Sequence, residues 1–209
     1  MKRATGLGNK ADMDLARLAQ DFASALVVAD GRRPIAHNQR TGLQFQPGIG
    51  PHSESRTIEL VVNEMRAAHP QRYSEVILGV PYPAQPRQKC DIVFHLNGGR
   101  LFVEAKLLRL LGDNGKPNDN MLMHILSPYP PHRSAVTDCN KLRKSGFNGR
   151  TAILIFGYSY PEWPLEPAIE AFEVIARHGG RVGERYTALF GDLCHPIHAR
   201  GATFVWEVS

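Results

Sequence analysis

Cysteine is scarce in this chain of 209 residues, which contains only Cys90, Cys139 and Cys194. The three are isolated and show no paired spacing, whereas a disulfide framework needs an even set of cysteines at regular intervals. We therefore expect free thiols and a reducing compartment, the cytoplasm.

Long apolar runs are also missing. No stretch approaches the roughly 18 continuous apolar residues that span a membrane, and no apolar segment of a secretory signal follows Met1-Lys2-Arg3. The sequence has no internal repeat and no Gly-rich phosphate-binding fingerprint. We expect no membrane partner, and the missing fingerprint argues against nucleotide hydrolysis.

The excess of charge of one sign is small. Lysine and arginine outnumber aspartate and glutamate to give a net charge of +5 and a pI near 9.3. A mild positive excess favours polyanionic partners through neutralisation of phosphates. Length and composition fit a single domain with a full hydrophobic core.

The most informative segment runs from residue 90 to 106 and predicts a β-hairpin. Asn97-Gly98 is a strong turn signal because both residues tolerate positive φ. With that turn, Asp91 pairs directly with Glu104. If Gly98-Gly99 turns instead, Asp91 faces Lys106. Side chains alternate along a strand, so Glu104 and Lys106 share a face in either register, close to Asp91.

This arrangement predicts a divalent cation site. The two strands are nearly continuous in apolar residues around 92–94 and 101–103, which indicates burial on both faces. Carboxylates held together at the end of a buried sheet repel one another unless a cation lies between them. Oxygen ligands of this kind suit Mg²⁺, which promotes phosphodiester hydrolysis by activating water and neutralising charge.

At these residues the chain resembles the PD-(D/E)XK nuclease superfamily. Asp91, twelve intervening residues and then Glu104-Ala105-Lys106 match its motif, although Cys90 stands where the motif often has proline. The resemblance implies a restriction-endonuclease-like fold that binds Mg²⁺, with Mn²⁺ as a substitute. It implies that Asp91, Glu104 and the Ala105 carbonyl bind the metal and that Lys106 is the catalytic lysine.

Many members of that superfamily add a glutamate from the helix before the three-stranded meander. Glu54, Glu59 and Glu64 are the candidates here. The N-terminal end of that helix lies at the catalytic edge of the meander, and Glu54 falls on the same helical face as the buried stripe that contains Ile58. We therefore expect Glu54 to join the site, whereas a glutamate favoured by the helix dipole is the alternative.

The remaining pattern predicts an α/β protein with a mixed, largely antiparallel sheet flanked by helices. We expect an N-terminal helix and loop extension (1–52) before a nuclease-like domain (53–209), the two forming one compact domain. The core order αβββαβ is expected. Helices are predicted over 12–29, 53–69, 133–145 and 165–178, and strands over 73–80, 91–106 as the hairpin, 151–158, 186–193 and 203–208.

The segments between these elements are expected to be irregular. We predict a loop over 31–51, a proline-rich link over 81–89 and a long excursion over 107–131. Lys141, on the helix after that excursion, is within reach of a phosphate or is simply an exposed charge. Cys194, His195 and His198 have zinc-binding side chains but no partner pair in sequence, so we expect a turn there rather than a zinc site.

The sequence thus predicts a Mg²⁺-dependent endonuclease that hydrolyses DNA, with DNA favoured over RNA as the partner. Cleavage of both strands favours a symmetric homodimer. The alternative from another class is a DNA-binding or assembly subunit on a nuclease scaffold that does not cut, since a fold does not guarantee its chemistry. An enzyme that acts on a small phosphorylated substrate is a third reading.

Overall fold

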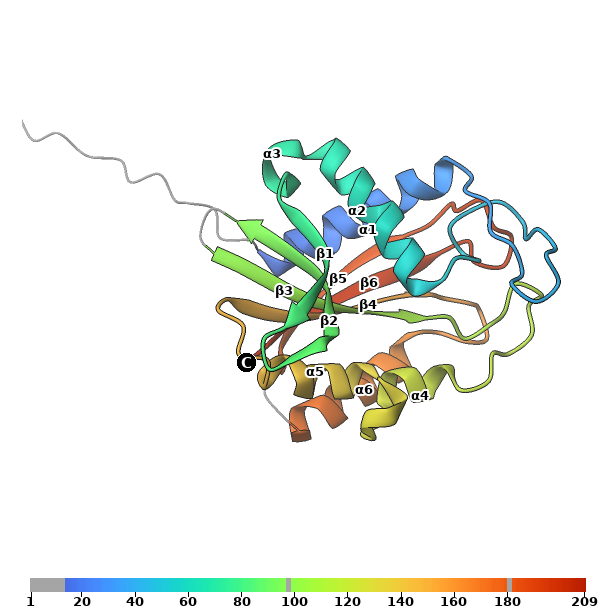
Figure 1. Cartoon of the computed structure of the whole chain (residues 1–209). Coiled ribbons are helices and arrows are strands. Elements are labelled where there is room, and N and C mark those ends of the chain that lie inside the picture. The colour runs from blue at the N-terminus through green and yellow to red at the C-terminus, as the bar shows by residue number, and fades with distance from the viewer. Residues whose placement is uncertain (1–13, 97–98, 180–181) are drawn as a thin grey trace, which may run out of the picture.

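The computed structural model describes residues 14–96, 99–179 and 182–209, and it is an α/β protein with helices on both faces of one mixed sheet (Figure 1). The sheet has six strands in the order β1-β2-β3-β4-β6-β5. Only β3 and β4 pair in parallel, and the other neighbours are antiparallel. The strands are β1 (Val76–Tyr82), β2 (Gln85–Leu96), β3 (Gly99–Leu108), β4 (Arg150–Tyr158), β5 (Val182–Phe190) and β6 (Gly201–Val208).

The helices divide between the two faces of the sheet. Side chains of α1 and α2 enter one hydrophobic core, and those of α4, α5 and α6 enter the other. The helices are α1 (Leu15–Gly31), α2 (Glu54–Ala68), α3 (Pro70–Tyr73), α4 (Met121–Leu126), α5 (Ala135–Arg143) and α6 (Glu166–Gly179), with a short 3₁₀ turn at Pro130–His132. The predicted mixed sheet flanked by helices is confirmed.

Polar caps set where the main helices begin. Asp14 accepts a hydrogen bond from the backbone N–H of Ala16 at the start of α1, Ser53 accepts one from Arg56 at the start of α2, and Ser134 accepts one from Thr137 at the start of α5. Such caps satisfy backbone donors that the first helical turn leaves unpaired. They fix the first residue of α2 at Glu54, which places its side chain at the helix end.

Of the two predicted hairpin registers, the structure has the one with the turn at 97–98. Ile92 pairs with Val103, and Leu96 pairs with Gly99, as a turn at 97–98 requires. The two turn residues themselves lie outside the described residues. The apolar runs at 92–94 in β2 and 101–103 in β3 are buried, as predicted from their continuous hydrophobicity, and most of β4 is buried as well.

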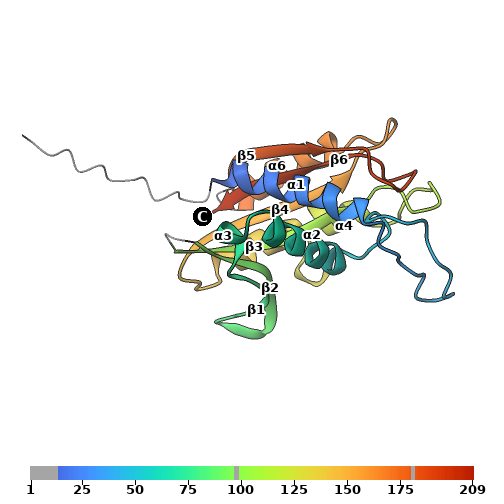
Figure 2. The ribbon, with the colours of Figure 1, turned by 90° about the horizontal axis from the view of Figure 1, so that it is seen from above.

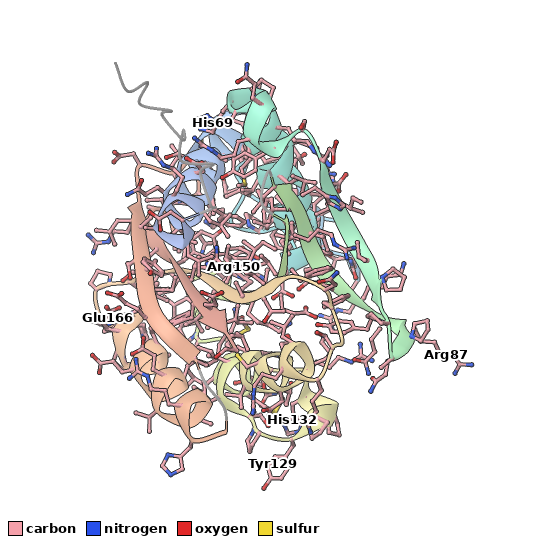
Figure 3. All side chains as sticks on the ribbon, turned by 90° about the vertical axis from the view of Figure 1, so that its left-hand side faces the viewer. His69, Arg87, Tyr129, His132, Arg150 and Glu166 are labelled. Atoms are coloured by element: carbon pink, nitrogen blue, oxygen red, sulfur yellow. The ribbon has the colours of Figure 1, made fainter. Side chains whose placement is uncertain are left out.

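The prediction of a proline-rich link over 81–89 was wrong. β1 continues to Tyr82 and β2 already begins at Gln85, so the two strands form an arm that projects beyond the rest of the sheet (Figure 2). Prolines are tolerated here because β1 is an edge strand, where the missing N–H breaks no interior ladder. Figure 3 shows Arg87 at the outer end of this arm.

Other boundaries also moved. The strand predicted from residue 73 starts at Val76, because Pro70 opens the short helix α3, which ends at Tyr73. The excursion over 107–131 contains α4, and β5 and β6 begin earlier than predicted. The loop predicted over 31–51 is confirmed from residue 32 onward, with only an isolated bridge between His37 and Gln44.

Helix α1 is an integral part of the larger core. Its buried side chains, including Leu18, Phe22 and Leu26, belong to the same cluster as α2 and the sheet. Residues 14–31 therefore fold onto the remainder of the chain. Among the described residues, no helix has both the length and the apolar character needed to cross a membrane.

Close packing between β4 and β6 leads to a stability prediction. A Cβ at Gly201 would collide with the carbonyl oxygen of Gly157. We expect Gly201→Ala to lower the free energy of unfolding by about 2 kcal/mol or more, because a backbone neighbour cannot move aside cheaply. The matched control is Gly183→Ala on β5, where the nearest atom would lie 3.6 Å away. Urea denaturation of both variants measures the difference, and equal stabilities would contradict this packing.

Candidate active site

The predicted motif residues meet where β2 enters the central sheet and β3 approaches its end. Asp91 Oδ2 accepts a hydrogen bond from the backbone N–H of Ala105, at 2.8 Å. The Asp91 carboxylate is near enough to Glu104 to raise the pKa of the Glu104 carboxyl. Glu104 is buried, with 2% of its surface exposed. The fully buried Ala105 packs in the core that α1 and α2 cover.

Glu54 reaches the same place from the first residue of α2. Its Oε2 accepts a hydrogen bond from the backbone N–H of Leu107 at 2.7 Å, and its Oε1 lies 3.6 Å from Lys106 Nζ. The other two candidate glutamates are engaged elsewhere: Glu59 pairs with Arg56, and Glu64 pairs with Arg32. The structure therefore places Glu54, and neither of the other two, beside the hairpin residues.

Helix α5 adds a carboxylate and an ammonium group. Asp138 Oδ2 lies 2.8 Å from Lys106 Nζ, and its Oδ1 lies 2.9 Å from Lys141 Nζ. Lys141 Nζ also lies 2.7 Å from Glu104 Oε1. Asp138 therefore bridges two lysines, and Lys141 bridges two carboxylates. These contacts connect helix α5 to strand β3 through ion pairs.

Tyr82, at the end of β1, completes the contacts of Glu104. Its buried hydroxyl donates a hydrogen bond to Glu104 Oε1, the oxygen that also contacts Lys141. Lys141 Nζ lies 5.0 Å from the centre of the Tyr82 ring, within the range of a cation–π interaction. Tyr82 thereby holds both a carboxylate and an ammonium group in place.

The electrostatics of the cluster reflect an excess of carboxylates. Burial raises the pKa of Glu104 well above its ordinary value, and the carboxylates of Asp138 and Asp91 raise it further. Burial also raises the pKa of Glu54. Burial acts to lower the pKa of Lys106, but Glu54 and Asp138 outweigh it, and that pKa lies above its ordinary value. Lys106 therefore stays protonated at neutral pH.

These groups line a cavity of about 680 Å³ that opens to solvent. One wall is the β1–β2 arm, which contributes Gln85, Arg87 and Lys89. The opposite wall is helix α5 and its flanks, which contribute Arg133 and Lys144. The acidic cluster thus lies inside a cavity whose rim carries positive side chains.

Asp91, Glu104 and Glu54 offer carboxylate oxygens, the ligand type that Mg²⁺ takes in proteins, one or two at a time together with water. Among the described residues, no three of these acidic side chains bring ligand atoms within 4.8 Å of one another. Asp91 and Asp138 raise the pKa of the buried Glu104 carboxyl, so a proton or a cation on Glu104 relieves repulsion between carboxylates. A role for the Ala105 carbonyl as a further ligand stays a prediction.

Sequence reasoning missed two members of this cluster. Asp138 had a signal, since it lies four residues before the buried Leu142 and directly before the buried Cys139 on the inner face of α5. Tyr82 had none, because it fell in the segment read as a proline-rich link. Lys141, left undecided between phosphate contact and exposure, lies in the cluster with a quarter of its side chain exposed.

The raised pKa of Glu104 leads to a stability prediction for the protein in EDTA. A carboxyl with a raised folded-state pKa stabilises the fold fully below about pH 4, and this contribution is lost as the pH rises through the raised pKa. Glu104→Gln replaces this carboxyl with a neutral amide, so the variant does not lose stability through ionisation at this position. We expect its Tm to exceed that of the parent by a few degrees at about pH 8 and by less at about pH 5.

Thermal unfolding followed by circular dichroism at both pH values makes the measurement. Glu59→Gln is the matched control, because Glu59 is half exposed and pairs only with Arg56 on its own helix. A Glu104→Gln variant no more stable than the parent at the higher pH would show that the carboxylates do not repel one another.

Comparison with known families, curated proteins and solved structures found no match. What the structure offers as a basis for function is the convergence of Glu54, Asp91, Glu104 and Lys106, with Asp138 and Lys141, in one open cavity.

Proposed function

We propose that this protein is a Mg²⁺-dependent nuclease that hydrolyses phosphodiester bonds in DNA. The observation that carries the proposal is the convergence of Asp91, Glu104, Glu54 and Lys106 in a solvent-open cavity. The order α2, β1, β2, β3, α5, β4 supports a restriction-endonuclease-like core, because it reproduces the αβββαβ order that the resemblance implies.

In this proposal Asp91 and Glu104 hold the cation, and Glu54 lies beside them. Mg²⁺ or Mn²⁺ would supply Lewis acidity there, making water a better nucleophile and neutralising negative charge on the phosphate. The hydrogen bond from the Ala105 N–H orients Asp91, and the hydrogen bond from the Leu107 N–H orients Glu54. The backbone of β3 thus positions two carboxylates from two other elements.

In this scheme Lys106 donates hydrogen bonds and supplies a positive charge. Its raised pKa keeps it protonated, so it cannot accept a proton from water at neutral pH. An ammonium group held by carboxylates is suited to orienting the attacking water and to stabilising charge that develops on the phosphate oxygens. Asp138, at 2.8 Å, fixes the position of that ammonium group.

Lys141 has a different part in the proposal. Its ammonium group contacts Glu104, which a metal would also use, and its side chain is a quarter exposed toward the cavity. With a cation held by Glu104, Lys141 would be free to exchange that contact for a substrate phosphate, while its contact with Asp138 keeps it beside the cavity that it lines.

The rim of the cavity supports a polyanionic substrate. Arg87 and Lys89 on the arm and Arg133 and Lys144 beside α5 all line the cavity, and the chain as a whole carries a charge of +5. Positive groups on both sides of an acidic centre suit a phosphate backbone that passes across it. A small phosphorylated substrate would not need positive charge on both walls.

Replacement of the site residues should abolish cleavage. We expect Asp91→Asn and Glu104→Gln to lower the rate of DNA cutting at least about a thousandfold and Glu54→Gln about tenfold to a hundredfold, since each loses a charged metal contact. Supercoiled, linear and single-stranded DNA are incubated with Mg²⁺, Mn²⁺ or EDTA, and products are separated on gels.

The matched control for Glu54→Gln is Glu59→Gln on the same helix, which should cut at the parental rate. Retarded bands without metal-dependent products would replace the proposal with a DNA-binding subunit that does not cut. Digestion of RNA but not DNA would show that RNA is the substrate. Full activity of the Asp91→Asn variant would show that this cluster is not the active site.

The arm provides a prediction for binding. We expect Arg87→Gln with Lys89→Gln to weaken DNA binding severalfold and to reduce the slope of log affinity against log salt by about 1.8, because each lost phosphate contact contributes about 0.9. Cleavage at saturating DNA should stay close to the parental rate. Fluorescence anisotropy across a salt series measures the slope.

Arg177→Gln on α6 is the control for that experiment, because Arg177 pairs with Glu173 on its own helix and does not line the cavity. It should leave both the affinity and the salt slope unchanged. An arm variant that binds with the parental slope would show that the DNA does not contact the arm.

A further inference from the structure

A second polar cluster lies in connections that the proposed nuclease chemistry does not use. Asp113 belongs to the segment between β3 and α4, and His195 and His198 belong to the segment between β5 and β6. One ligand atom from each of these three side chains lies within 4.8 Å of the other two. Both histidines are completely buried, and the Asp113 side chain is 18% exposed.

The contacts of His198 resemble those of a metal-binding imidazole. Its Nε2 lies 3.0 Å from Asp113 Oδ1, and its Nδ1 lies 2.8 Å from the hydroxyl of Tyr160. A histidine that binds a metal through one nitrogen usually donates the other N–H to an oxygen, which fixes its tautomer. With the proton on Nδ1 and Tyr160 accepting it, Nε2 presents a lone pair toward Asp113.

His195 supplies the second observation. Its Nε2 is buried and has no hydrogen-bond partner within the described part of the chain. Buried polar atoms without a partner are rare and costly, so this nitrogen needs a ligand or a water. Its Nδ1 accepts only long contacts, of 3.2 and 3.3 Å, from the N–H groups of Ile197 and His198. Those contacts are weak enough to be exchanged when a ligand binds Nε2.

We propose that Asp113, His195 and His198 form a binding site for a divalent transition metal of the zinc type, separate from the carboxylate cluster. Two imidazoles and one carboxylate suit zinc better than magnesium, which prefers oxygen ligands alone. Three protein ligands leave one coordination position for water. In the metal-free protein His198 would carry its proton on Nε2, donate it to Asp113 and accept a hydrogen bond from Tyr160 at Nδ1; metal binding would move that proton to Nδ1.

Asp113 is the member of the cluster that reaches a cavity. Together with Arg109 and His52 it lines an open cavity of about 620 Å³, whereas His195 and His198 do not line it. Arg109 opposes a cation, since its Nη1 lies 3.8 Å from Asp113 Oδ1, but it also donates a hydrogen bond to the Gly50 carbonyl, at 2.6 Å.

A metal here would join two connections that are far apart in the sequence. The β5–β6 connection also packs closely against the loop before α2. There is so little room between them that a Cβ added at Gly50 would lie 2.7 Å from the His198 ring. An ion bound by Asp113 and both histidines would therefore cross-link the segments after β3 and after β5. We expect its main effect to be a gain in stability, because an ion that binds only the folded chain shifts the unfolding equilibrium.

The test uses the full chain with the Glu104→Gln substitution as the parent protein, so that metal bound at the carboxylate cluster does not contribute to the measured binding. Protein stripped with a chelator is titrated with Zn²⁺ by calorimetry and with Co²⁺ by visible absorption. We expect one site per chain, a rise in Tm with Zn²⁺, and the ligand-field bands of a four-coordinate Co²⁺ site. Adding Asp113→Asn should weaken binding at least about tenfold.

Asp192→Asn is the matched control, because Asp192 is an exposed acid in the same β5–β6 connection and should leave metal binding unchanged. Asp113→Asn is the decisive variant, since its side chain keeps its shape and is partly exposed. His198→Gln adds weight only if its circular dichroism matches the parent. The absence of Zn²⁺ and Co²⁺ binding, or equal binding by the Asp113→Asn and Asp192→Asn proteins, would overturn the proposal.

Discussion

The repulsion among four carboxylates at one corner of the sheet is the constraint on which the candidate site depends. Glu54, Asp91, Glu104 and Asp138 converge there, and the ammonium groups of Lys106 and Lys141 balance only part of their charge. Burial makes each unbalanced charge more costly than it would be in water. The cluster therefore favours protonation of Glu104 or the arrival of a cation, and the second response is the basis of the proposed chemistry.

The sheet makes this arrangement possible because β3 is buried on both faces almost to its end. Elements on opposite faces then meet at its last residues: α2 brings Glu54 from one side, and α5 brings Asp138 and Lys141 from the other. Backbone N–H groups of Ala105 and Leu107 hold two of the carboxylates. Rigid elements, rather than loops, thus determine the geometry of the charges, while the β1–β2 arm supplies one wall of the cavity.

The start of α2 separates two polar regions of different chemistry. On one side lie oxygen ligands and lysines, and on the other lie two buried histidines, Asp113 and Arg109. Arg109 follows Lys106 by three residues, so the end of β3 contributes a cation to each region. The two proposals therefore assign different ions to the two regions, magnesium to the oxygen ligands of the first and zinc to the imidazoles of the second.

The sequence by itself limited the hairpin to two registers, with a turn at Asn97-Gly98 or at Gly98-Gly99, and placed Asp91, Glu104 and Lys106 together in both; the pairing of Leu96 with Gly99 in the structure selects the first. It also favoured Glu54 over Glu59 and Glu64 as the helix carboxylate, because the order of the elements places the N-terminal end of that helix beside the end of the hairpin. Only the tertiary structure decided that Tyr82, Asp138 and Lys141 join them, and that Asp113 lies beside His195 and His198. Those contacts depend on how distant elements pack across the sheet, which no local pattern of residues specifies.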